Sequence, residues 1–241
     1  MSDAKRHHYV PQFILNNFVE SDNKLYVWYK DQNEIICSAP RDVFVENHGY
    51  NNTLEDGYSI TEAEAAPIVK KIIDGSPAQH VLSLSNVERK DLDMFVFCLW
   101  FRGPDYIESL PSVRDRGGIK GNSSLRDESV EAQINLVCNE EGAVACEILA
   151  NLECGACAVN GKDRLVLGSS PVVHYESSIW LPITPTLAVR YVAPRVTLPY
   201  ELGDDAVGAI NRAVVDGLSS KIASGSKERL EALRNAEQGV K

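Results

Sequence analysis

The chain has 241 residues, of which 44% are hydrophobic and 24% are charged, with 16 glycines and 11 prolines. This composition is typical of an ordinary folded protein with one large domain or two small ones, and it excludes a disordered chain or a collagen-like repeat. The 34 acidic residues outnumber the 24 lysines and arginines and give a formal net charge of −10. Bulk binding of nucleic acid or acidic lipid is therefore not expected, although a local basic site is compatible with this balance.

The beginning of the chain does not resemble a secretion signal. Met1–His8 is basic but is not followed by an apolar stretch of the usual length. The longest apolar run, Met94–Phe101, has eight residues, whereas a helix that spans a bilayer needs about 20. We expect a cytoplasmic protein that does not cross a membrane.

The cysteines are too sparse for a disulfide framework. Cys154-Gly-Ala-Cys157 has the spacing of a zinc or redox motif. However, Asn160-Gly161 predicts a hairpin between Glu153–Val159 and Asp163–Leu167, which would place both cysteines on one strand with their side chains on opposite faces. The pattern favours half-buried thiols over a structural zinc site.

The first part of the chain predicts short elements in sequence order. Pro11 is suited to the first position of a helix over Gln12–Phe18, which carries Gln12 and Asn16 on one polar stripe. Further predictions are a hairpin of Lys24–Tyr29 with Glu34–Cys37, and a helical turn followed by a strand within Arg41–Asn52.

Two longer helices are predicted next. Thr61–Asp74 has helical spacing, with a kink at Pro67 unless the helix starts late. Ser85-Asn-Val-Glu88 fits a capping box that opens a helix from Asn86 to just before Gly103-Pro104. Since this helix contains the longest apolar run, we expect it to be buried nearly all round at the centre of the core.

The second half of the chain is richer in predicted strands. A loop over Ser112–Ser124 and a helix over Leu125–Asn139 come first. Strands are then predicted at Ala143–Leu152, around Asn160, at Ser178–Leu181 and at Thr186–Val192, followed by helices at Asp204–Val215 and Lys227–Glu237. Helices and strands in blocks indicate a single α+β domain over residues 1–241, with the polar C-terminal helix at 226–238 on its periphery.

The densest polar cluster is Lys5–Gln12, which places two cations and two histidines in an otherwise acidic protein. Such a cluster favours a local anion site. If His7 and His8 are extended, their side chains face opposite sides, so only one imidazole can act on a given substrate atom. The alternative is that one imidazole packs in the core and the other is solvated.

Lys5–Phe18 resembles the opening signature of a widespread, mainly bacterial family of unknown function whose members begin K-x-H-H-Y-V-P-Q-F-Y-L-R-x-F. Similar family features follow in order along nearly the whole chain, at Leu25–Tyr29, Glu62–Ile73, Arg102–Pro104, Leu165–Val172, Pro182–Pro185 and Asn211. The resemblance brings no settled activity. It does select the candidate site residues His7, His8, Gln12, Arg102 and Asn211.

Two positions depart from the family pattern. Ser169 stands where the family's T-S-D-N-P-V segment has an aspartate, and Asn16 replaces the arginine of L-R-x-F. If that aspartate binds a metal or orients a histidine, this chain lacks it. The second change removes one cation from the proposed anion site.

Arg102 and Asn211 each have a structural alternative. A guanidinium at the end of the most apolar helix must reach solvent, find a carboxylate or anionic ligand, or bond the last helix carbonyls. Asparagine within a helix suggests a buried hydrogen bond to a loop or a ligand. His48 and His174 are isolated and are interpreted as ordinary strand or loop residues.

Common nucleotide-binding, serine-hydrolase and zincin motifs are missing from the sequence. A histidine beside an arginine can act as a general base or a metal ligand while the arginine holds a phosphate. The leading hypothesis is therefore a hydrolase of phosphoesters or nucleic-acid phosphodiesters, with an anionic substrate and with a divalent metal left open. The alternative is a non-catalytic, acidic binding protein in which the His-His segment is structural; the oligomeric state is not predicted.

Overall fold

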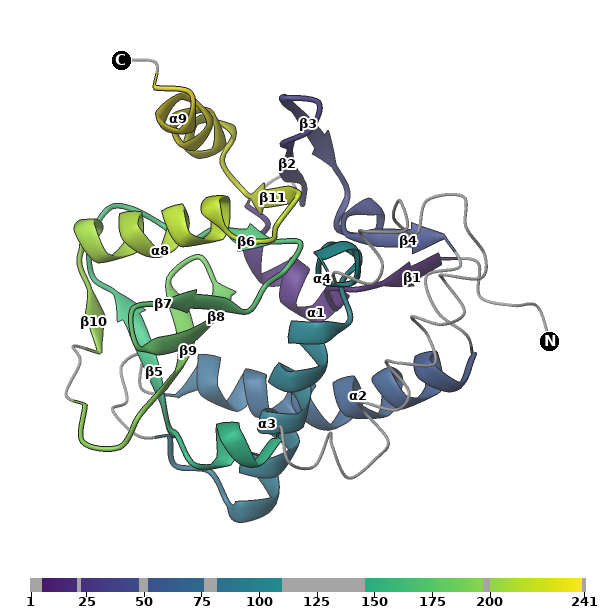
Figure 1. The fold of residues 1–241 in the computed structure, drawn as a ribbon, viewed down its shortest axis with the longest axis vertical. Helices are drawn as coiled ribbons and strands as arrows, with labels where there is room; N and C mark the ends of the chain where they lie inside the picture. The colour runs from purple at the N-terminus through teal and green to yellow at the C-terminus, as the bar shows by residue number, and fades with distance from the viewer. Residues whose placement is uncertain are drawn as a thin grey trace.

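The computed structural model describes residues 6–20, 23–47, 52–75, 82–109, 146–196 and 200–239 (Figure 1). The predicted loop at Ser112–Ser124 and the predicted helix at Leu125–Asn139 lie outside these residues, as does His48. Within the described residues the chain combines helices with antiparallel and mixed sheets. The predicted α+β class is confirmed.

In the part of the chain that the structure describes, the strands form three sheets, and almost all of their pairs are antiparallel. The first sheet pairs β1 (Arg6–His8) with β4 (Val45–Asn47). The second has the order β3 (Glu34–Ser38), β2 (Leu25–Tyr29), β11 (Lys221–Ser224) and β6 (Leu167–Gly168). The third has the order β10 (Glu201–Leu202), β5 (Glu153–Val159), β9 (Leu187–Val192), β8 (Ser178–Thr184) and β7 (Val173–Tyr175), with only β10 and β5 parallel.

The short N-terminal elements follow the predicted order. Helix α1 (Gln12–Leu15) continues into the 3-10 turn η1 (Asn16–Phe18), and β2 and β3 form the predicted hairpin. The turn η2 (Pro40–Asp42) precedes β4, as expected. One detail differs: Pro11 has an extended ψ of 142° and caps α1 instead of occupying its first turn, because ψ is not restricted by the proline ring.

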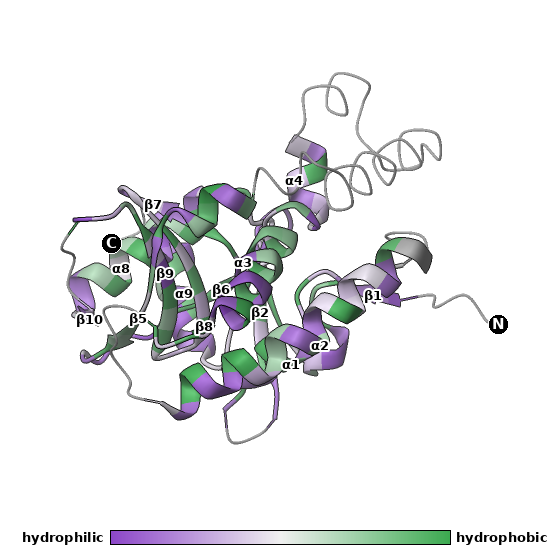
Figure 2. Cartoon of the chain, turned by 90° about the horizontal axis from the view of Figure 1, so that it is seen from below, coloured by the Kyte–Doolittle hydropathy of each residue, from purple (hydrophilic) through white to green (hydrophobic). Residues whose placement is uncertain are grey.

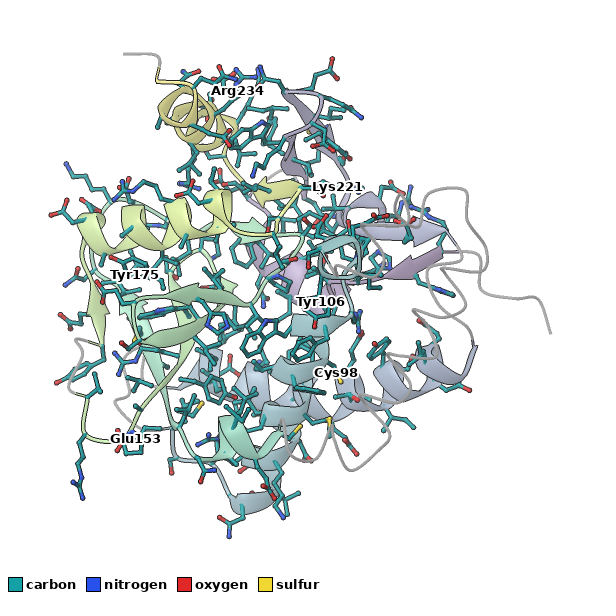
Figure 3. All side chains as sticks on the ribbon, in the orientation of Figure 1. Cys98, Tyr106, Glu153, Tyr175, Lys221 and Arg234 are labelled. Atoms are coloured by element: carbon teal, nitrogen blue, oxygen red, sulfur yellow. The ribbon has the colours of Figure 1, made fainter. Side chains whose placement is uncertain are left out.

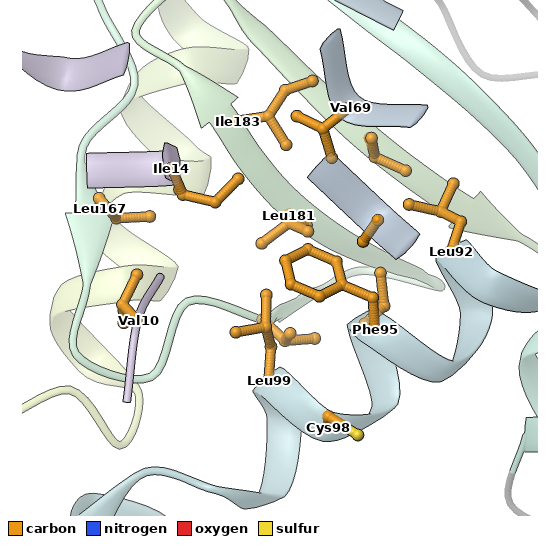
Figure 4. Packing of buried hydrophobic residues seen from close by; sticks show 14 of the residues in the cluster. Val10, Ile14, Val69, Leu92, Phe95, Cys98, Leu99, Leu167, Leu181 and Ile183 are labelled. Carbon is orange, nitrogen blue, oxygen red and sulfur yellow. The ribbon is translucent and has the colours of Figure 1, made fainter. Parts of the chain in front are cut away.

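Two long helices build much of the core. Helix α2 (Asn52–Asp74) starts well before the predicted Thr61 and carries Pro67 inside it, and its hydrophilic and hydrophobic bands alternate in Figure 2. Helix α3 (Asn86–Phe101) begins with the predicted capping box at Ser85. Its residues 95–99 are all buried, which confirms its central position. In Figure 4, Phe95 of α3 points towards Leu181 of β8.

The prediction for residues 143–167 is wrong in two respects. Residues 146–150 are helical instead of extended; the apolar Ile148 is 60% exposed, so the alternating pattern there does not mark a buried strand face. Strand β5 pairs with β9 and β10, and the chain after Asn160-Gly161 crosses to β6 in another sheet. A turn signal predicts a change of direction, but it does not specify the partner strand.

The third sheet separates two hydrophobic clusters. Cys154 belongs to the first cluster, with α1, α2 and α3, and Cys157 to the second, beneath α8 (Asp204–Asp216). The prediction that these thiols face opposite sides is confirmed, although both are fully buried. Helices α8 and α9 (Lys227–Glu237) match their predicted ranges closely.

Candidate functional site

Strand β1 separates the two histidines. The side chain of His7 is 2% exposed, whereas His8 is half-buried on the other face of the strand, which it shares with the exposed Arg6. This is the expected alternation of an extended chain. Only His8 therefore presents its imidazole towards the surface.

The carbonyl oxygen of Arg41 gathers the side chains on this outer face. Nε2 of His8 lies 3.2 Å from that oxygen, and Nη2 of Arg6 donates to it over 3.3 Å. The side-chain nitrogen of Gln12, on the first turn of α1, lies 3.2 Å from Nε2 of His8. Arg6 also pairs with Asp42 over 2.8 Å. We call Arg6, His8 and Gln12, together with the Arg41 carbonyl and Asp42, the His8 cluster.

The electrostatic environment keeps His8 neutral. Partial burial lowers the pKa of His8 below 6.5, and the positive charges of Arg6 and Arg102 act in the same direction. The hydrogen bond to the Arg41 carbonyl and the charge of Asp42 oppose this shift without cancelling it. A neutral imidazole at pH 7 is suited to accept a proton.

Arg102 contacts the main chain of His8 and Tyr9 but does not face solvent. It is 2% exposed, and Nε donates to the carbonyl oxygen of Tyr9 over 2.9 Å while Nη2 donates to that of His8. Nη1 donates to the carboxylate of Glu62 over 2.6 Å, and the guanidinium lies over the ring of Tyr58. Arg102 therefore has a carboxylate partner, which is one of the predicted alternatives. This partner, Glu62, lies on α2.

Ser169 lies in a second polar cluster, on the other side of Tyr9. Its hydroxyl group, which is fully buried, donates to the carboxylate of Asp105 on α4 (Pro104–Ser109) and accepts a bond from the main-chain nitrogen of Lys221. Asp105 also accepts from the nitrogen of Ser220 over 3.2 Å. A carboxylate is thus present beside residue 169. It belongs to Asp105 of α4, whereas the resemblance implies an aspartate at position 169 itself.

Lys221 connects this second cluster to the N-terminal segment. Its ammonium group donates to the hydroxyl of Tyr9 over 3.2 Å and lies 5.8 Å from the ring centres of Tyr9 and Tyr29. Figure 3 labels Lys221 at β11 and Tyr106 on the neighbouring α4. The two clusters are therefore held on either side of one residue, Tyr9.

Asn211 is not part of either cluster. Its amide oxygen accepts from the nitrogen of Val166 and its amide nitrogen donates to the oxygen of Arg164, both at about hydrogen-bond length (3.0 and 2.9 Å). Helix α8, which carries Asn211, and β1 lie on opposite sides of the molecule in both views (Figures 1 and 2). Of the predicted site residues, the structure brings together His8 and Gln12, places Arg102 and His7 behind them, and leaves Asn211 elsewhere.

Three contributing side chains, Arg6, Glu62 and Asp105, are not among the predicted site residues. Arg6 shares a strand face with His8, a signal that its spacing of two residues could have supplied. Glu62 and Asp105 had no such signal, because their partners are 40 and 64 residues away along the chain. In the described ranges, no three His, Cys, Asp or Glu side chains come together in a way that could hold a metal ion.

A family model of a protein of unknown function, DUF4238, matches residues 6–152. These residues are more than half of the 241. The chain belongs to this family. The match includes His7, His8, Gln12 and Arg102 but ends before the other segments for which a resemblance was predicted, Leu165–Val172, Pro182–Pro185 and Asn211.

Neither the curated proteins nor the solved structures contain a significant match to this chain. Among the described helices, none is both long and apolar enough to cross a bilayer.

Proposed function

We propose that the protein is a hydrolase of phosphoesters, including nucleic-acid phosphodiesters, and that the His8 cluster is its active site. The observation that carries this proposal is the position of the His8 imidazole. It is half-buried, has a lowered pKa, and shares the Arg41 carbonyl with the guanidinium of Arg6. A proton acceptor and an anion-binding group are thereby held on one strand face.

In the proposed reaction, Nδ1 of His8, the ring nitrogen that does not donate to the Arg41 carbonyl, accepts a proton from water as the water oxygen attacks phosphorus. The bond between phosphorus and the leaving oxygen breaks, and protonated His8 returns the proton to that oxygen. Arg6 binds the phosphoryl oxygens, which carry the negative charge of the transition state. Gln12 positions the imidazole through its amide.

The residues behind the strand act as positioning residues. Arg102 bonds the carbonyl oxygens of His8 and Tyr9, and Glu62 holds the guanidinium in place. Since all three guanidinium nitrogens already donate to the protein, we assign the phosphate to Arg6 instead of Arg102. His7 anchors the inner face of β1, and Asn211 has no part in this proposal.

The test is hydrolysis of aryl phosphate monoesters and diesters, single-stranded and duplex DNA, and RNA, each without added metal and with Mg²⁺, Mn²⁺ or Zn²⁺. We expect activity on at least one substrate class and a loss of at least about 100-fold in His8→Asn, since general-base catalysis contributes factors of this size. His174→Asn is the matched control, because burial also lowers the pKa of that histidine. Activity that survives in His8→Asn, or a wild-type protein inactive on every substrate and metal, would refute the proposal.

A second candidate function is non-catalytic binding, with the His-His segment as a structural lock. The burial of His7 and the bonds from Arg102 to the main chain of residues 8 and 9 favour it. On this alternative, His7→Ala lowers the melting temperature as a core substitution does, and His8→Asn changes no separable activity. The activity of His8→Asn therefore distinguishes the two functions, because His7→Ala destabilises the protein on both.

A further inference from the structure

Strand β3 lies at the edge of the four-stranded sheet. Within the described residues it pairs only with β2, in a continuous register from Leu25 with Ser38 to Tyr29 with Glu34. Its own residues, Glu34-Ile-Ile-Cys-Ser38, include an isoleucine that is 41% exposed, Ile36, and the exposed Cys37. Figure 1 shows the β2–β3 hairpin projecting beside α9, away from β1 and α3.

Edge strands in monomeric proteins are usually protected against pairing with another chain. Lysine, proline, a bulge or a very short strand serves this purpose. Strand β3 has five residues without lysine or proline, its one charged residue, Glu34, stands at its end, and its pairing with β2 contains no bulge. Helix α9 contacts β3 but adds no strand to its edge. Its main chain is therefore suited to accept another antiparallel strand.

The side chains of β3 are self-complementary when the strand is reversed about Ile36. A twofold axis at this residue places Ile36 opposite Ile36 of a second copy and Glu34 opposite Ser38. On the other face of the sheet, Ile35 then lies opposite Cys37. This register also pairs all five residues of the strand, and it sets apolar side chains against one another with no like charges opposed.

Charges beyond the two ends of the strand favour the same arrangement. The exposed acidic residues Asp31 and Glu34 lie at the hairpin end, and Arg41, whose side chain is 79% exposed, follows the other end. Antiparallel pairing brings Asp31 and Glu34 of one strand towards Arg41 of the other, which lies 3.7 Å from its own neighbour Asp42. A register centred on Glu34 would instead oppose two carboxylates.

We infer that β3 binds β3 of a second copy of this chain in antiparallel register about Ile36, so that the two four-stranded sheets become one continuous sheet. This pairing is independent of the proposed hydrolase activity. An interface built from two five-residue strands is small, so the association is weak and depends on protein concentration.

The first test is sedimentation of the wild-type chain at increasing protein concentration, because an interface this small is weak. We expect the mass to rise towards that of a dimer. Ile36→Lys should return the protein to a monomer, because it places two ammonium groups face to face at the axis. Ile60→Lys, at an isoleucine of α2 that is 61% exposed, is the matched control and should leave the dimer intact.

The register is tested by oxidative cross-linking in a Cys37→Ser background. Ile36→Cys should form a disulfide-linked dimer, and so should the double variant Glu34→Cys with Ser38→Cys. The single variant Glu34→Cys, Ile60→Cys and the background itself should not. A wild-type chain that stays monomeric, a dimer unaffected by Ile36→Lys, or equal cross-linking at positions 36 and 60 would each overturn the inference.

Discussion

Arg102 holds His8 by its main chain: Nη2 of the guanidinium donates to the carbonyl oxygen of the histidine. The imidazole is oriented separately, by the Arg41 carbonyl and Gln12. Two different sets of contacts thus fix the strand and the ring. Removal of the buried Arg102 contacts should therefore lower the stability of the protein more than removal of the contacts around the imidazole.

Arg102→Ala should lower the free energy of unfolding by about 3 kcal/mol or more, because it leaves the Glu62 carboxylate and two inward-facing carbonyl oxygens without their partner. Urea denaturation of the wild type and the variant measures this change. Arg6→Ala is the control: its pair with Asp42 has side chains 51% and 44% exposed, so a loss of no more than about 1 kcal/mol is expected. Equal effects in the two variants would contradict the anchoring role of Arg102.

The stability of the protein should rise with pH through the window below pH 6.5. Burial lowers the native pKa of His8 from 6.5, and it does the same for His174. Below 6.5 and down to the native pKa, the unfolded chain therefore binds more protons than the native one, which favours unfolding. Each neutral histidine makes its full contribution to the free energy of unfolding above pH 6.5. This contribution falls as the pH decreases towards the native pKa.

Urea denaturation at pH values between about 5 and 8 measures this slope, since unperturbed histidines titrate there. His8→Asn and His174→Asn should each reduce the slope of stability against pH. The double variant should reduce it more than either single variant. A slope that is unchanged in the double variant would assign the pH dependence to other groups.

Ser169→Asp should destabilise the protein by roughly 2–4 kcal/mol, although it restores the residue that the family resemblance implies. The new carboxylate would be buried against the carboxylate of Asp105, which Ser169 now serves as a donor. Adding Asp105→Asn should recover much of the loss, because an amide can donate to the new carboxylate. A double-mutant cycle gives the coupling; additive effects of the two substitutions would show that the side chains do not interact as described.

Asn211→Ala should cost about 2 kcal/mol, because the nitrogen of Val166 and the oxygen of Arg164 lose their partners in a buried position. Thermal and urea unfolding measure the loss. Asn160→Ala, whose amide reaches Glu201 at the surface, should change stability by less than about 0.5 kcal/mol. Any hydrolase activity should persist in Asn211→Ala at temperatures where it is folded, and a selective loss of activity would return Asn211 to the site.

The sequence predicts those parts of the structure whose signals are local. The capping box at Ser85 and the apolar run behind it specify α3, and the spacing of Asp204–Val215 specifies α8. The opposite orientations of His7 and His8 follow from the period of an extended chain. For these features, the residues that determine the geometry are neighbours in the chain.

Only the tertiary structure decides which distant residues meet. The chain after Asn160 joins another sheet instead of returning along β5, Glu62 neutralises Arg102, and Asp105 supplies a carboxylate to Ser169. Each of these contacts depends on how two elements pack, and packing depends on shape and burial summed over the whole core, not on spacing within a segment. For the same reason, the local period predicts that His7 and His8 face opposite sides, but only the packing of the core decides that His7 is the buried one.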